Sequence, residues 1–310
     1  MGNRALNEGS YDKAITFYEQ SLKEQPNYTA ALNNRGVAKM ELGHPHEAIL
    51  DYNQAIAAAP DYKDALLNRA YAYEAISQFK NALADVDRVN QLTPDSSFVY
   101  FYKGLIFTQM KQYDSAYRCF QVSDSLNPDN PETIINMATI HYFKDDLPQA
   151  EAYIDRALEL QSEDPNAFNL MSLVALEKEE YTRALAQINR ALDLVPEEPY
   201  FINNRGFIYL QMDELELAIK DINRSIVLNP KNGWAYRNKG IYLLKTGEAK
   251  EGIDLFNRAM ATNEFIDEIY YYLGLAHQML SNEDQACQAW KLGAAQNELK
   301  SKTMSAQNCD

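Results

Sequence analysis

Asparagine recurs at one fixed interval along the chain or at multiples of it, at Asn34, Asn68, Asn136, Asn204 and Asn238. An asparagine amide offers one acceptor and two donors, so one side chain can pair with both the N–H and the C=O of a peptide backbone. Such amides, repeated along one surface, could hold an extended chain without reading its side chains. They could also bond to neighbouring helices and stabilise their packing. The two interpretations are compatible, and both stay open.

Two regions add aromatic rings to this chemistry. The first carries an aromatic patch at helical spacing, formed by Phe98, Phe101 and Tyr102. The second mixes rings, amides and one arginine, at Tyr200, Asn203, Asn204, Phe207, Trp234, Arg237, Asn238 and Tyr271. Aromatic and arginine side chains dominate the binding energy of many interfaces. We therefore expect residues 200–271 to hold the principal peptide or protein site, although aromatic stripes are also typical of a core.

Residues for catalysis or metal binding are not arranged at useful spacings. The four histidines are His44, His46, His141 and His277, and none has a helical partner suited to a metal ion. The sequence contains no glycine-rich phosphate loop, nucleophile elbow or Cys-x-x-Cys motif. Neighbouring carboxylates such as Glu179 with Glu180 are interpreted as solvated charge. We expect no enzyme activity, no metal and no cofactor.

The elements that would position these residues follow from a second repeated pattern. Six of the eleven prolines fall on a 34-residue grid, at residues 26, 60, 94, 128, 196 and 230. Ten residues beyond each grid point stands a small residue, such as Gly36 or Gly240. Six residues beyond stands a large apolar or aromatic one, such as Leu32. This pattern predicts close antiparallel helices, in which a small residue of one helix admits a bulky residue of the other.

Each 34-residue repeat is therefore predicted to form two helices, and the second helix ends at the grid proline, which cannot continue a helix. A 34-residue unit of this kind resembles the tetratricopeptide repeat. The resemblance implies an all-α, right-handed superhelical solenoid of antiparallel helix pairs, forming one domain over residues 1–300. Its units are a partial one at 1–28 and full ones at 29–62, 63–96, 97–130, 131–164, 165–198, 199–232, 233–266 and 267–300, followed by a tail at 301–310.

In this family the first helices of successive units line a concave groove that receives an extended peptide or a partner's helix. The resemblance thus implies a non-catalytic scaffold or adaptor whose groove is lined by the amides and rings named above. The family's clamp for chaperone-tail carboxylates is not matched, because Ala30, Phe98 and Tyr102 stand where it needs lysine or arginine. Two alternatives stay open: a targeting or regulatory arm of a larger enzyme or a secretion or assembly complex, and a self-associating scaffold.

Composition restricts the partner. The net charge of −15 argues against nucleic acid, whose phosphates require clustered lysine and arginine. No apolar stretch approaches the roughly 18 residues of a membrane-spanning helix. We expect a protein or peptide partner, no nucleic acid and no transmembrane segment.

The two ends of the sequence carry further expectations. Gly2 already holds a mid-helix small position, so we expect an incomplete first unit with an apolar edge at Leu6, Tyr11 and Ile15 that would allow self-association. That incomplete start leaves both a cytoplasmic and an exported, periplasmic location open. The segment around Cys287, with Cys309 beyond it, resembles the closing segment of exported bacterial repeat proteins. The resemblance implies a candidate disulfide between them, and two free thiols are the alternative.

Overall fold

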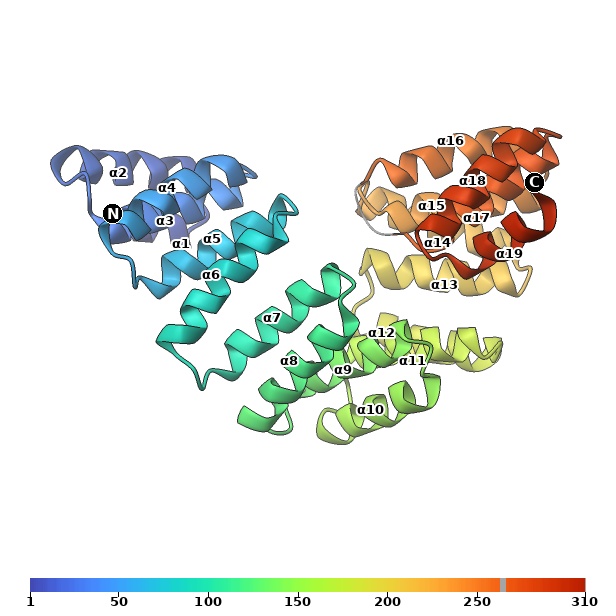
Figure 1. The fold of residues 1–310 in the computed structure, drawn as a ribbon, viewed down its shortest axis with the longest axis horizontal. Helices are drawn as coiled ribbons and strands as arrows, with labels where there is room; N and C mark the ends of the chain where they lie inside the picture. Colours follow the sequence, from blue (N-terminus) through green and yellow to red (C-terminus); the bar gives the residue numbers. More distant parts are fainter. Residues whose placement is uncertain (263–265, 310) are drawn as a thin grey trace. The chain divides into compact units, whose positions relative to one another are not determined.

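The computed structural model describes residues 1–262 and 266–309, and these residues form helices joined by turns, with no strand among them (Figure 1). The chain divides into two compact units, Met1–Leu160 and Gln161–Asp310. The all-α fold predicted from the sequence is confirmed. The single continuous stack over residues 1–300 stays a prediction.

The described helices of the first unit are α1 (Gly2–Asn7), α2 (Tyr11–Glu24), α3 (Thr29–Glu41), α4 (Pro45–Ala58), α5 (Lys63–Ala75), α6 (Phe79–Leu92), α7 (Ser97–Gln109), α8 (Tyr113–Leu126), α9 (Pro131–Phe143) and α10 (Leu147–Leu160). Those of the second unit are α11 (Pro165–Glu177), α12 (Tyr181–Leu194), α13 (Pro199–Gln211), α14 (Leu215–Leu228), α15 (Gly233–Lys245), α16 (Ala249–Met260), α17 (Ile269–Met279), α18 (Glu283–Ala295) and α19 (Leu299–Asn308).

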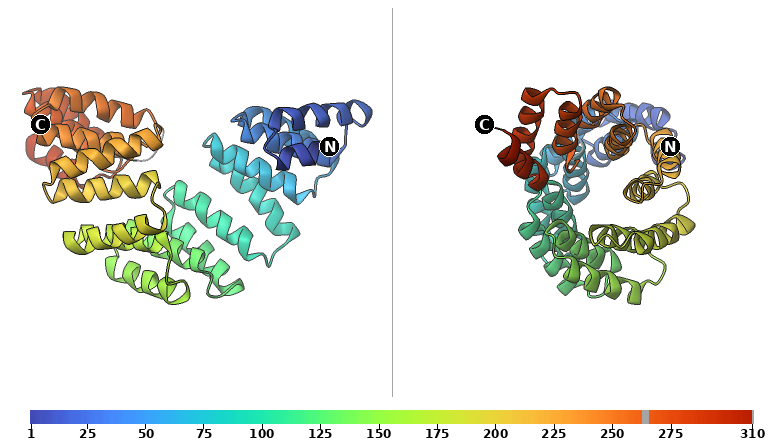
Figure 2. Two further views of the ribbon diagram at one scale, coloured as in Figure 1. Left: turned by 180° about the vertical axis from the view of Figure 1, so that it is seen from behind. Right: turned by 90° about the vertical axis from the view of Figure 1, so that its right-hand side faces the viewer.

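The helices alternate between a first and a second helix of each pair, and the second helices begin at the constant interval of the repeat, from Tyr11 to Glu283. Within each unit the two helices of a pair pack on each other, and the second then packs on the first helix of the next pair (Figure 2). The grid prolines stand just beyond the second helices, as Pro128 does after α8 ends at Leu126. The predicted helix ends are confirmed.

In several pairs the close packing depends on a glycine of the first helix and a ring of the second. A Cβ atom added to Gly36 would lie 2.5 Å from Cε1 of Tyr52, and one added to Gly240 would lie 2.5 Å from Cε1 of Phe256. The small position was predicted, but its bulky partner was not. That partner lies on the second helix, and it is not the large residue of the first helix that the sequence pattern singled out.

The turn between the two helices of a pair has one residue in the left-handed backbone region. This residue recurs once in each repeat and is glycine three times, as at Gly43 with a φ of 78°. Elsewhere it is a residue with a side chain, such as Glu179 with a φ of 59°. Glycine adopts this conformation without a steric penalty, and it ends many helices for that reason.

Three helix pairs are also joined by buried ion pairs that the sequence analysis did not find. In each, an arginine of the first helix meets an aspartate of the second: Arg35 with Asp51, Arg69 with Asp85, and Arg205 with Asp221. These three aspartates are no more than 8% exposed. They differ from the solvated carboxylates expected from the sequence, because each is held at the helix contact by a guanidinium.

We expect that replacing Ala184 of α12 by leucine lowers the free energy of unfolding by about 1 to 3 kcal/mol, because extra methylene groups in a packed interior force neighbours apart. The Ala184 side chain is fully buried. Repeat units contact only their neighbours, so the damage should also split thermal unfolding into two transitions. Calorimetry checks this. A single melting transition at the wild-type temperature would contradict the packing.

The two ends of the chain differ in part from expectation. Leu6, Tyr11 and Ile15 are half-buried and pack against the core that contains Ala14. Self-association through this edge stays a prediction. The residues assigned to a tail lie mostly in α19, which packs on α18. A disulfide joins Cys287 of α18 to Cys309, with their Cα atoms 5.5 Å apart.

Candidate functional site

The predicted amides lie on the first helices, where four of them bridge successive pairs. In the first unit, Asn68 Nδ2 donates to Asn33 Oδ1 at 2.9 Å and so links α5 to α3. In the second unit, the Nδ2 atom of Asn204 donates to the Oδ1 atom of Asn169 at 2.8 Å and links α13 to α11. These bonds match the packing role that the sequence analysis left open beside a binding role.

Asn238 bridges in the same way, with its Nδ2 atom 2.9 Å from the Oδ1 atom of Asn203. Both residues are almost fully buried, at 1% exposure each. The structure therefore places two of the predicted binding residues in the interior of the second unit.

The amides differ in which of their hydrogen-bonding atoms remain available to a ligand. Asn136 donates to the backbone oxygen of Glu132 in its own helix. Asn34 donates to Asn3 and accepts from Asn33, so both ends of its amide are used. The half-buried Asn68 and Asn204 each use one N–H in the bridge, which leaves the Oδ1 atom and a second N–H of each amide for another partner.

Arg237 is buried among half-buried aromatic rings of α13, α15 and α17. Its guanidinium carbon is 4.9 Å from the ring centre of Phe207, 5.4 Å from that of Trp234 and 5.1 Å from that of Tyr272. Cations attract aromatic faces at such distances. Its Nη2 atom also donates to Glu268 at 3.4 Å. Arg237 is 4% exposed, so it stabilises the core of this unit.

Three aromatic residues predicted for the second region remain nearer the surface. Tyr200 is 38% exposed at the start of α13, and Phe207 is half-buried two turns further along. Tyr200, Asn204 and Phe207 follow one another at helical spacing, which places them on one face of α13. Tyr271 is half-buried, and its backbone N–H donates to Glu298 Oε2 at 3.1 Å.

Glu298 closes the N-terminal end of α17, because it also accepts from the backbone N–H of Tyr270 at 3.3 Å. Ser301 donates to the same carboxylate at 2.6 Å. Burial raises the pKa of Glu298, and these hydrogen bonds oppose that shift. This residue stands at the end of the last repeat, 267–300, and its contact with α17 was not predicted from the sequence.

The aromatic patch of the first unit contains a ring that the sequence analysis missed. The ring of Tyr102 lies 4.5 Å from that of Tyr71 on α5 and 6.3 Å from that of Phe98. Tyr102 is buried, whereas Tyr71 is 41% and Phe98 45% exposed. Phe101 turns inward and meets Phe120 of α8 at 5.8 Å. The patch is therefore formed by Tyr71, Phe98 and Tyr102.

Within residues 1–262 and 266–309, no three histidine, cysteine, aspartate or glutamate side chains are grouped to hold a metal ion. His141 instead bonds to Asp146 through Nδ1 at 2.9 Å.

Among the residues that the structure describes, no helix combines the length and apolar character needed to cross a membrane.

Comparisons with known proteins agree with the helix pairs. Sequence profiles described as tetratricopeptide repeat match residues 2–28, 34–97, 107–174 and 200–232, which together exceed half of the chain. No curated protein sequence matches it.

Solved structures share the fold at low sequence identity. The yeast Tom70 structure is 18% identical over 89% of this chain and 60% of its own, with a TM-score of 0.64. The Cut9 and Hcn1 hetero-tetramer of APC/C gives 15% identity over 86% of this chain and 52% of its own, with a TM-score of 0.62. This chain thus spans little more than half the length of these two proteins. A tetratricopeptide repeat protein from Parabacteroides merdae is 18% identical, covers 89% of this chain and 95% of its own, and has a TM-score of 0.50.

The recurring helix pairs, the glycine and ring contacts in several of them and the matched profiles lead to one assignment. The chain belongs to the tetratricopeptide repeat family.

Proposed function

We propose that the chain is a non-catalytic interaction scaffold that holds an extended peptide segment against its first helices. Tetratricopeptide repeats support a protein-interaction role in general. The observation that carries the finer proposal is the state of the Asn68 and Asn204 amides. Each is positioned by a hydrogen bond to the preceding first helix and keeps an acceptor and a donor for a ligand.

The α13 surface illustrates how such a segment would be held. The free Oδ1 atom and N–H of Asn204 would pair with one peptide group of the ligand. The exposed ring of Tyr200, one turn earlier on the same face, would cover a ligand side chain. Backbone pairing with one amide is tolerant of sequence, so we expect specificity to come from the neighbouring rings.

The test begins with a random peptide library displayed on phage and selected on the full chain. We expect extended peptides to be enriched, and replacement of Asn204 by alanine to weaken their binding about tenfold, the value of one net hydrogen bond with a partner left unpaired. Fluorescence anisotropy of a labelled, enriched peptide measures the change.

Asn169→Ala is the matched control. Both substitutions remove the same bridge between α11 and α13, but only Asn204→Ala removes the amide that would contact the peptide. We expect the two variants to melt at similar temperatures and to differ in affinity. Equal affinities for Asn204→Ala and Asn169→Ala, or a selection that enriches no peptide, would contradict the proposed function.

A further inference from the structure

Tyr102 interrupts the series of asparagines on the first helices of the first unit. It stands one repeat after Asn68 and two repeats after Asn34, so it replaces the asparagine of the two preceding pairs. Its side chain is 2% exposed, and its hydroxyl oxygen is buried with no hydrogen-bond partner among the described residues. A buried hydroxyl without a partner is uncommon and calls for an explanation.

Glu74 of α5 presents a second unsatisfied atom beside this hydroxyl. Its Oε2 atom is buried without a hydrogen-bond partner, whereas its Oε1 atom accepts from Nε2 of Gln109 at 2.5 Å. Burial raises the pKa of Tyr102, and the Glu74 carboxylate, which lies close enough to interact with the hydroxyl, raises it further. Glu74 forms no ion pair with a residue that the structure describes.

Two further aromatic rings lie against the ring of Tyr102. Tyr71 lies on one side of Tyr102 and Phe98 stacks near it, with interplanar angles of 35° and 20° to the Tyr102 ring. Rings attract a cation through their faces, and a carboxylate supplies the opposite charge. The combination suits a planar cation that can stack on a ring and donate several hydrogen bonds.

We propose that Tyr71, Phe98, Tyr102 and Glu74 bind an arginine side chain of the segment held by the first helices. This inference rests on the proposed function and names one residue of its ligand. A guanidinium has five N–H donors in a flat fork, so it can donate to Glu74 Oε2 and Tyr102 Oη while its face covers a ring. The negative charge of the chain favours the approach of a basic segment.

Entry of the guanidinium requires a side-chain movement, because neither acceptor atom is open to solvent in this structure. Tyr71 and Phe98 are the rings able to move, since each has more than two fifths of its surface exposed. Rotamer changes of this kind are common when partners bind. Lysine would fit less well, because its compact ammonium cannot both stack and donate in a fork.

The experiment uses peptides enriched by selection on the full wild-type chain. We expect arginine to recur in them at one position. Replacement of that arginine by citrulline, which keeps the shape but removes the charge, should weaken binding about tenfold, and replacement by lysine should weaken it less than citrulline does. Glu74→Gln should abolish the difference between the arginine and citrulline peptides. Fluorescence anisotropy measures all three affinities.

Glu132→Gln provides the matched control, because Glu132 is an exposed glutamate of α9 outside this cluster. It should keep the preference for arginine. Tyr71→Leu is a second variant that retains an apolar side chain at an exposed position and should reduce the preference severalfold.

Two outcomes separate this inference from the proposed function. Enriched peptides that lack arginine, or that prefer arginine equally in the wild type and in Glu74→Gln, would overturn the inference while leaving the scaffold function standing. A selection that enriches no peptide would contradict the function and the inference together.

Discussion

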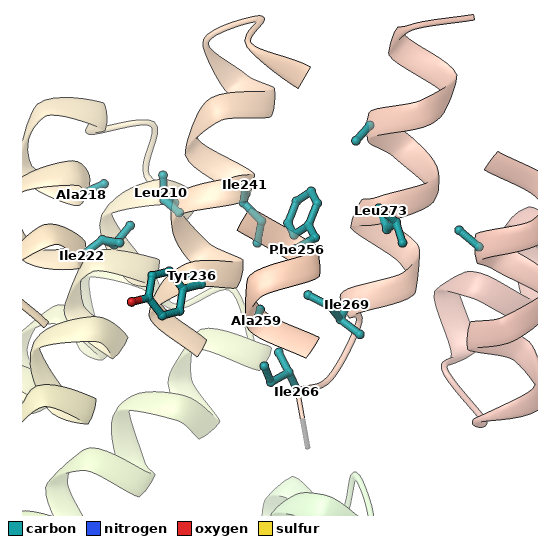
Figure 3. Packing of buried hydrophobic residues seen from close by; sticks show 12 residues of the cluster. Leu210, Ala218, Ile222, Tyr236, Ile241, Phe256, Ala259, Ile266, Ile269 and Leu273 are labelled. Carbon is teal, nitrogen blue, oxygen red and sulfur yellow. The ribbon is translucent and has the colours of Figure 1, made fainter. Parts of the chain in front are cut away.

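Replacing Phe256 by alanine is expected to lower the free energy of unfolding of the second unit by about 3–5 kcal/mol, the usual loss for a buried phenylalanine. The Phe256 ring is fully buried and lies among Ile241, Ala259 and Ile269 (Figure 3). It also faces Gly240. Chemical denaturation followed by circular dichroism measures the loss.

A double-mutant cycle with Gly240 tests whether the contact between this glycine and the Phe256 ring contributes to the loss of stability. Gly240→Ala alone should destabilise by about 1 to 3 kcal/mol, because the new methyl group would meet the ring. In the Phe256→Ala background the same substitution should cost much less, because the ring is gone. A coupling of about 1 kcal/mol or more is expected for residues in such contact. Additive effects would show that Gly240 and Phe256 do not pack as described.

Replacing Arg205 by methionine is expected to destabilise the second unit by about 3 kcal/mol, near the lower end for breaking a buried ion pair because both partners keep some exposure. Arg205 Nε donates to Asp221 Oδ2 at 2.6 Å, and Nη1 donates to Asn189 Oδ1 at 3.0 Å. Arg205 thus connects α13 to both α14 and α12. Its loss leaves the Asp221 carboxylate, 8% exposed, without its cation.

Two further variants test whether the loss of stability in Arg205→Met comes from the buried ion pair. Arg224→Met removes an arginine whose pair with Glu197 is exposed, so it should change stability little. The double variant Arg205→Met with Asp221→Leu removes both charges and should recover part of the loss, because no unpaired carboxylate stays buried. An Arg205→Met chain as stable as Arg224→Met would contradict a structural role for the pair.

The helix pairs could be predicted from the sequence because their spacing is strict. Proline follows six of the second helices at a fixed place, and a small residue recurs where the two helices approach. The bulky partner was also periodic, at Tyr52, Phe120 and Phe256 among others, but the sequence alone does not show which of several apolar positions faces the glycine. That depends on the rotation of one helix against the other.

The exposure of the candidate site residues was less predictable, because it also depends on how neighbouring helices are rotated against one another. Asn204 and Asn238 hold equivalent positions, yet only Asn238 is almost fully buried, because the cluster around Arg237 covers it. Tyr71 was missed because it contributes to the patch from α5, whereas Tyr102 lies on α7. Periodicity places a residue on a helix, but its exposure depends on the side chains of the neighbouring unit.

The most direct test of the binding surface is site-specific photo-crosslinking with an enriched peptide. A benzoylphenylalanine would replace Tyr200 on the first helix α13 in one variant and Val227 on the second helix α14 in another. Both side chains are exposed, at 38% and 73%. The proposed function predicts a crosslink to the peptide from position 200 and none from position 227. A crosslink from position 227 alone would place the ligand on the second helices and contradict it.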